Sequence, residues 1–291
     1  MKIHHFLQVD STNIQAKRMA EANAPDGTVV VAEHQTAGKG RMDRHWDSPD
    51  GGNIYMSILL RPDFATDKAS MLTLVMAHSV VMVLREREQV DAKIKWPNDI
   101  VAQGKKLVGI LTEMNAGMDG IKYVIIGVGI NVNQETFSED LADKATSLYL
   151  CRDGKRDLLS EHTFTETDSV VSLEDSPSYR GKEDKQPPST AQQAHCEKLP
   201  TAILIEAILE QFERDYEVFQ KMGNLSFLLE EYNQLLVNRN QEVIIHQPEG
   251  SYQAYALGIN SGGELLVRRA DGREEAIFAG EVSVRGIEGY I

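Results

Sequence analysis

Cysteine is scarce in this chain of 291 residues, which contains only Cys151 and Cys196. Two cysteines are too few for a secreted disulfide scaffold or for a metal site built from thiolates. They flank one polar segment, so a local bridge between them is one interpretation. We favour the interpretation that both thiols are unpaired, as is usual in a reducing compartment.

Long apolar runs are also missing from the pattern. No window approaches the roughly 20 apolar residues that a transmembrane helix needs. The first residues lead straight into a strand-like stretch and lack the apolar core of a signal peptide. We therefore expect a cytoplasmic protein with no membrane partner. Its hydrophobic fraction of 42% and charged fraction of 25% are ordinary for a globular protein, and its length allows two domains.

An excess of positive charge is the third missing feature. The chain has 30 Lys and Arg against 44 Asp and Glu, which gives a formal net charge of −14. Nucleic-acid binding needs cations clustered on one face, so we expect no nucleic-acid partner. The cations that do cluster lie in short loops, which suit small phosphorylated ligands.

Alternating and β-branched runs predict strands in the first half of the chain, at 2–9, 28–33, 53–60, 92–96, 100–102, 106–114 and 123–132. Helical composition and spacing predict helices at 14–23, 69–88, 200–221 and 226–236. Asp10 or Ser11 is the expected N-cap of the first helix, since a short side-chain oxygen there can accept from a free amide. The order of elements indicates an α+β fold with a mixed sheet and helices packed on one face.

The composition changes twice in the second half of the chain. Residues 152–198 are polar and follow no period, which indicates an inserted surface segment. From residue 238 onward short strands are separated by hairpin turn signals, which predicts a small C-terminal module, an SH3-like β-barrel. We therefore predict one domain at 1–237, with the insert 152–198, and a second at 238–291.

A glycine-rich loop at 35–46 carries the clearest chemistry. Gly38 and Gly40 allow the backbone to approach a ligand, and their amides can form an anion-binding concavity. Lys39, Arg41 and Arg44 add three cations within six residues. A phosphate or an adenylate would suit this loop, although a solvated basic turn explains the spacing equally well.

A second candidate region begins at residue 95. Pro97 ends a strand, so Asn98 and Asp99 form a turn that presents an amide and a carboxylate. Lys106 begins an otherwise apolar strand, where its ammonium could neutralise a carboxylate and a phosphate together. The alternatives are a turn around a buried Trp96 and a lysine that extends from the strand edge to solvent.

Two further motifs have both a structural and a functional interpretation. Gly127 and Gly129 lie inside a strand, where glycine marks tight sheet packing or the close approach of a ligand. A strand-turn-helix context is missing, so we reject a dinucleotide-binding motif. Ser11, Thr12 and Asn13 follow Asp10, and they either cap a helix or offer hydrogen bonds to a polar head group.

Taken together and in order, these motifs resemble the biotin protein ligase family, in its short form without a DNA-binding domain. The family's Ser-Thr-Asn, Gly-Arg-Gly-Arg, Lys-Trp-Pro-Asn-Asp, Lys-Leu-x-Gly-Ile-Leu-x-Glu and Gly-x-Gly-Ile-Asn elements all have counterparts here. The resemblance continues at 145–148 and resumes at 279–283 in the C-terminal module, whereas the polar insert falls outside it.

The resemblance implies a role for each matching residue. Lys106 and Arg41 would be the catalytic residues. The biotin-binding positions would be Ser11, Thr12, Asn13, Gln35, Gly38, Arg41, Arg44, Lys106 and Gly109. The ATP- or adenylate-binding positions would be Gly38, Lys39, Gly40, Arg41, Trp46, Asn98, Asp99, Lys106 and Asn131. No metal ligand is assigned.

The implied activity has two steps. Biotin and ATP, with Mg²⁺, would form biotinyl-5′-AMP, and the biotin would then pass to a lysine of a biotin carboxyl carrier protein or domain of a biotin-dependent carboxylase. A homodimer is compatible with this resemblance.

The glycine-rich loop departs from the family pattern at three positions. Lys39 stands where arginine is common, which keeps the charge but loses the bidentate fork. Met42 and Asp43 replace a basic or small pair, and Asp43 adds a negative charge beside the expected phosphate site.

Three other functions compete with this one. A lipoate-protein ligase or octanoyl transferase would share the architecture, but the motif at 95–99 and the C-terminal module favour biotin. A non-catalytic sensor of biotin or its carrier is disfavoured by the presence of Lys106 and Arg41. A DNA-binding repressor is disfavoured because the chain begins at the catalytic domain.

Overall fold

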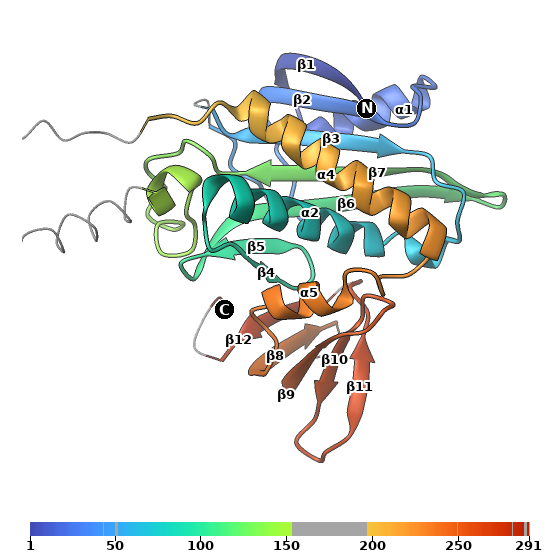
Figure 1. Cartoon of the computed structure of the whole chain (residues 1–291), viewed down its shortest axis with the longest axis vertical. Coiled ribbons are helices and arrows are strands. Elements are labelled where there is room, and N and C mark those ends of the chain that lie inside the picture. The colour runs from blue at the N-terminus through green and yellow to red at the C-terminus, as the bar shows by residue number, and fades with distance from the viewer. Residues whose placement is uncertain are drawn as a thin grey trace, which may run out of the picture.

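Two β-sheets and the helices that cover them form the protein (Figure 1). The computed structural model describes residues 1–42, 44–49, 52–152, 197–248, 250–280, 282–287 and 290. Most of the predicted insert 152–198 lies outside the described residues, as do Asp43 and Cys196. Cys151 is buried, with its Sγ 3.6 Å from Thr146 Oγ1.

The larger sheet has seven strands in the order β1-β2-β3-β7-β6-β5-β4. Their bounds are β1 Lys2–Val9, β2 Thr28–Gln35, β3 Ile54–Leu60, β4 Lys93–Lys95, β5 Asp99–Ala102, β6 Lys105–Gly117 and β7 Gly120–Ile130. β1 and β2 are parallel, and every other neighbouring pair is antiparallel. The predicted mixed sheet is therefore confirmed.

Helices cover both faces of this sheet, because its central strands are apolar on both sides. All seven residues of β3 are buried. The long helices α2 (Met71–Glu88) and α4 (Thr201–Met222) pack together on one face (Figure 1). The shorter α1 (Thr12–Glu21) packs against Leu59 and other residues of the opposite face. The prediction that the helices share one face thus holds for α2 and α4 and is wrong for α1.

The α2 region also corrects an expectation about apolar runs. Thr66–Glu88 comprises the short 3-10 helix η1 (Thr66–Lys68) and α2. In the described part of the chain it is the one helical segment long and apolar enough to span a membrane, so the expectation that no window approaches this was wrong. Of its apolar window, 72% is buried inside the protein, as in the core helix of a globular fold.

The second sheet is antiparallel and has the order β11-β10-β9-β8-β12. Its strands are β8 Gln241–Gln247, β9 Gly250–Ile259, β10 Leu265–Arg268, β11 Glu274–Ile277 and β12 Ser283–Gly286. An antiparallel β module at this end of the chain was predicted, although within the described residues β11 and β12 do not pair to close a barrel. One continuous apolar core includes residues of both sheets.

Helix α5 (Leu229–Leu235) joins the two sheets. Just after α5, Val237 N donates to Ile94 O of β4 at 2.9 Å. Trp96, which is 1% exposed, donates from its indole nitrogen to Gly263 O at 3.1 Å. The domain boundary at 237/238 stays a prediction, since the core runs through it.

A buried histidine links α2, α4 and α5. His78 is 5% exposed, and its ring nitrogens each lie 3.0 Å from a carboxylate oxygen, of Asp215 on α4 and of Glu231 on α5. Burial by itself would lower the pKa of His78, but the hydrogen bonds and charges of the two carboxylates outweigh it, so the pKa is raised. The imidazolium form is therefore favoured in the folded protein.

We predict that this ion cluster makes stability depend on pH. The folded pKa of His78 lies above the unfolded value, so its contribution is fully present below that unfolded value of about 6.5 and is lost as pH rises through the folded pKa. The excess thermal stability of the wild type over His78→Gln should be largest below about pH 6.5 and should shrink as pH rises above it. The exposed His5 on β1 provides a control, and His5→Gln should show no such trend. A constant difference between wild type and His78→Gln would contradict the prediction.

Candidate functional site

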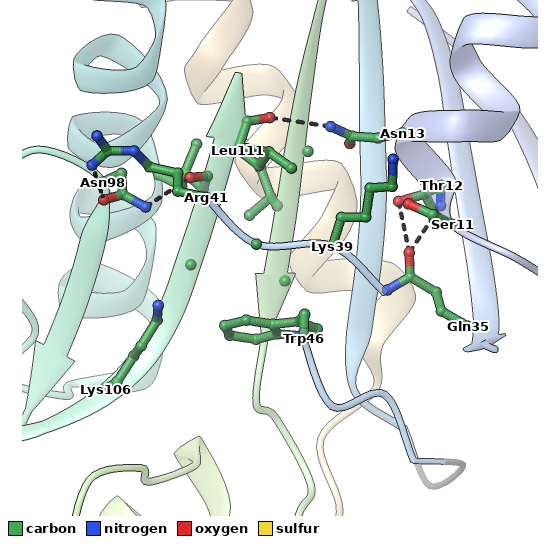
Figure 2. Close-up of a pocket in the computed structure, with 16 residues that line it drawn as sticks. Ser11, Thr12, Asn13, Gln35, Lys39, Arg41, Trp46, Asn98, Lys106 and Leu111 are labelled. Carbon is green, nitrogen blue, oxygen red and sulfur yellow. Dashed lines mark hydrogen bonds between the residues drawn. The ribbon is translucent and has the colours of Figure 1, made fainter. Parts of the chain in front are cut away.

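A polar pocket lies over β6 and β7, between the start of α1 and the glycine-rich loop (Figure 2). Its lining residues come from five stretches of chain: Ser11, Thr12, Asn13, Gln35, Lys39, Gly40, Arg41, Trp46, Asn98, Lys106, Gly109, Ile110, Leu111, Gly127, Val128 and Gly129. In Figure 2, Ser11, Thr12 and Gln35 lie on one side of the pocket and Arg41, Asn98 and Lys106 on the other, with Trp46 between them.

The first amide of α1 is capped by a residue that is distant in the sequence. Ser11 is the N-cap residue in extended conformation, but its side chain makes no capping hydrogen bond. Asp10 Oδ1 accepts from Ser11 N at 2.9 Å, outside the helix, and Gln35 Oε1 accepts from Thr12 N at 2.8 Å. Ser11 therefore holds the predicted N-cap position, but the capping hydrogen bond expected from its side chain was wrong, because Gln35 of β2 accepts from the first amide of the helix instead. Ser11, 2% exposed, is left to line the pocket.

Hydrogen bonds order the other polar residues of this wall. Ser57 Oγ lies 2.8 Å from Thr12 Oγ1 and 2.6 Å from Asn13 Oδ1. The amide of Asn13 donates to Glu113 Oε2 at 2.7 Å. Ser57 was missed by the sequence analysis, although a serine inside the apolar run of β3 was a usable signal. These bonds fix the orientation of each donor and acceptor that faces the pocket.

Gln35 connects these hydrogen bonds to the end of the glycine-rich loop near Trp46. Its Nε2 donates to Ser48 Oγ at 2.9 Å, and Ser48 Oγ donates to Trp46 O at 3.2 Å. A Cβ at Gly38 would collide with the Trp46 carbonyl and with Ser48. Glycine is thus required at position 38 so that the chain can pass close to the Trp46 carbonyl, and Gly38 does not line the pocket. Ser48 is a second residue that the sequence analysis missed.

Two strand glycines form the surface on which Trp46 lies. A Cβ at Gly109 would lie 2.6 Å from Trp46 Cζ3, and one at Gly129 would lie 2.6 Å from Trp46 Cε2. A Cβ at Gly127 would likewise collide with the amide of Asn13. Gly127 and Gly129 are thus points of tight packing against side chains of the protein itself, and the close approach of a ligand there stays a prediction. The buried indole Nε1 of Trp46 has no hydrogen-bond partner among the described residues.

Lys106 lies beside a buried counter-ion. Its Nζ is 2.7 Å from Asp99 Oδ1, with side chains 28% and 14% exposed, and it lies 5.3 Å from the Trp46 ring centre. Burial would raise the pKa of Asp99, but the charge of Lys106 outweighs burial and lowers it. Burial lowers the pKa of the neighbouring Lys95 to about 8, partly opposed by Asp99. The site therefore holds Asp99 ionised between two lysines.

Arg41 binds the backbone of the C-terminal module. Its Nη1 donates to Asn98 Oδ1 at 3.0 Å, and Nη2 donates to the carbonyls of Ala279, Gly280 and Val282 at 3.0, 2.6 and 3.1 Å. Burial lowers the pKa of Arg41, opposed by the charge of Asp99. The predicted phosphate ligand thus connects the loop with the second sheet while it borders the pocket.

Most of the predicted residues converge on this pocket, and a few lie beside it. Arg44 and Asp99 line an adjoining cavity, which also contains Lys95, Arg285 and Tyr290. Asn131 is buried and donates to Thr146 O at 3.0 Å, so its role toward an adenylate stays a prediction.

Arg285 and Tyr290 of the adjoining cavity were not predicted, since nothing in the local sequence places them beside residue 99. Lys95 was also missed as a site residue. The signal that could have found Lys95 is the one that identified Lys106: a lysine at the end of an apolar strand.

The donor set suits anions better than a metal held by protein ligands. In the described part of the chain no three His, Cys, Asp or Glu side chains cluster as metal ligands would. Arg41 and Lys106 lie on one side of the pocket, next to the adjoining cationic cavity. The uncharged Ser11, Thr12 and Gln35 lie on the other side, where Figure 2 also shows Lys39. Such a pocket can take a ligand with a polar, uncharged head group and an anionic end, and it can bring a second anion to that end.

Comparisons with known proteins agree with this geometry. Residues 6–131 match the model of the Biotin/lipoate A/B protein ligase family. The bifunctional ligase/repressor BirA of Bacillus subtilis is 36% identical over 286 residues, which is 97% of this chain and 73% of that protein. The biotin–[acetyl-CoA-carboxylase] ligase of Mycobacterium tuberculosis is 37% identical over 146 residues, 48% of this chain and 52% of that protein.

A solved structure matches over the whole length. The biotin protein ligase from Aquifex aeolicus in complex with biotin and ATP superposes with a TM-score of 0.72 at 25% identity, covering 98% of this chain and 99% of that one. Sequence identity over most of a relative and agreement of the fold lead to one conclusion. The chain belongs to the biotin protein ligase family.

Proposed function

We propose that this protein is an ATP-dependent biotin protein ligase, which forms biotinyl-5′-AMP and transfers the biotin to a lysine of a carrier protein. The observation that carries the proposal is the position of Lys106. Strand β6 holds its ammonium between Asp99 and Trp46, at the border between the pocket and the adjoining cationic cavity. One cation there can contact two anionic reactants at the same time.

The polar wall suits the ureido head group of biotin, which offers one carbonyl acceptor and two N–H donors. Thr12 and Asn13 bring hydroxyl and amide groups whose orientations are fixed by Ser57. Ile110, Leu111 and Val128 provide apolar surface in the same pocket, as the aliphatic chain of biotin requires. The biotin carboxylate would then point toward the cationic wall.

Adenylation requires the approach of two anions. A carboxylate oxygen of biotin attacks the α-phosphorus of ATP, and the bond to pyrophosphate breaks. Lys106 would bridge carboxylate and α-phosphate, while Lys39 and Arg44 would offset the remaining phosphate charge. Mg²⁺ would enter with the nucleotide and neutralise phosphate charge, which fits a site with few free carboxylates, since Mg²⁺ is often held mainly by phosphates and water.

The mixed anhydride must be protected from water until transfer. Trp46 lies against the two strand glycines at the pocket, and Arg41 holds the loop to the carbonyls of the C-terminal module. Transfer follows when the neutral amine of the carrier lysine attacks the acyl carbon, AMP leaves and the amine loses a proton. We propose that the carrier is a biotin carboxyl carrier protein or domain and that the reaction takes place in the cytoplasm.

A lipoate-protein ligase is the second candidate, since the matching family model includes both kinds of enzyme. The polar wall favours biotin, because the apolar dithiolane ring of lipoate would cover Ser11, Thr12 and Asn13 without offering them hydrogen bonds. Incubation with labelled biotin and labelled lipoate, each with ATP and a carrier protein, separates the two. Transfer of lipoate in preference to biotin would overturn the proposal.

We predict that Lys106→Ala lowers biotin-dependent ATP–pyrophosphate exchange at least about 100-fold, the scale for removing one preorganised electrostatic group. Lys105 on the same strand provides a matched control, since its Nζ donates to Ala142 O and does not line the pocket. Lys105→Ala should retain wild-type exchange. Wild-type-like exchange in Lys106→Ala would refute the role of this lysine.

We predict that Arg41→Gly releases biotinyl-5′-AMP before transfer, because the loop loses its hydrogen bonds to Asn98 and to the module carbonyls. The adenylate can be measured in the filtrate after rapid ultrafiltration. Arg41→Lys should release less, since an ammonium can still donate to part of this set. Retention of the adenylate by Arg41→Gly at the wild-type level would count against a closing role for the loop.

A further inference from the structure

Tyr290 lies far along the chain from the catalytic strands, yet it contacts the turn at 95–99. Its hydroxyl donates to Asp99 Oδ2 at 2.5 Å. Its ring lies under the ammonium of Lys95, with Nζ 3.7 Å from the ring centre. Tyr290 therefore contacts a carboxylate and a cation that both border the cavity next to the pocket.

The two oxygens of Asp99 have different partners. Oδ1 pairs with Lys106 Nζ at 2.7 Å, and Oδ2 accepts from the tyrosine hydroxyl. Without that hydroxyl, Oδ2 would lack this partner in a largely buried position, which favours rotation of the carboxylate. Lys95 and Arg41, whose charges also interact with Asp99, are the alternative cations. The Tyr290 hydroxyl thus selects the orientation in which Asp99 faces Lys106.

We propose that Tyr290 is a positioning residue for the ligase reaction: its hydroxyl fixes the Asp99 carboxylate, and Asp99 in turn fixes the ammonium of Lys106. This inference rests on the proposed function. It adds a contribution from beyond β12 to the pairing of Asp99 with Lys106, two residues of the larger sheet. Arg44 and Arg285 also line the Tyr290 cavity, so an accurately placed counter-ion is required among several cations.

The test is biotin-dependent ATP–pyrophosphate exchange by Tyr290→Phe, which keeps the ring over Lys95 and removes only the hydroxyl. We expect kcat to fall about 10-fold, the scale for losing a hydrogen bond to a charged group, while KM for biotin stays within about 2-fold. The acid limb of the pH profile should move to higher pH, because the hydroxyl stabilises ionised Asp99. Tyr255→Phe on β9 of the same module is the matched control and should leave kcat and the acid limb unchanged.

A second variant tests the route through Asp99. In an Asp99→Asn background, Tyr290→Phe should change the residual exchange little, because the two residues act as one unit. A 10-fold loss that persists in this background, or a loss with an unmoved acid limb, would overturn the inference and indicate a general structural role. Wild-type kcat and acid limb in Tyr290→Phe would also overturn it. Absence of exchange in the wild type would instead refute the proposed function.

Discussion

Positive charge gathered around the pocket and its adjoining cavity is the constraint on which the site depends. Lys95, Lys106 and Arg44 repel one another: burial is the main cause of the lowered pKa of Lys95, and the charges of Lys106 and Arg44 lower it further. Asp99 offsets part of this repulsion and holds Lys106 on its strand. The positive charge of the pocket is therefore in place before an anionic substrate binds.

The shape of the pocket follows from missing side chains as much as from those present. Gly109 and Gly129 lie on neighbouring strands at paired positions, so they form one flat surface for Trp46. Glycine weakens a strand by itself, but β6 and β7 pair over most of their length and β7 also pairs with β3. A well-supported central sheet can therefore accommodate glycines where a ring must approach the backbone.

The two sheets act together at the site. Arg41 joins the glycine-rich loop to backbone carbonyls of the C-terminal module, and Tyr290 contacts Asp99 from beyond that module's last strand. Beneath these polar contacts, Trp96 and the continuous apolar core hold the sheets in one arrangement. The position of the loop over the pocket is thus coupled to the packing of a module that lines little of the pocket itself.

The sequence alone determined the elements and the identity of the main groups. Period-2 runs and helical spacing located most strands and helices, and the ordered motifs identified the family and placed Lys106, Arg41 and Trp46 in one site. These features are local, because backbone propensity and side-chain alternation act within a few residues. Only the tertiary structure decided the partners: Gln35 caps α1, Arg41 binds module carbonyls, and Tyr290 contacts Asp99. Each of these contacts joins residues 23 or more positions apart, and which of several competing donors reaches a buried acceptor depends on how the whole chain packs.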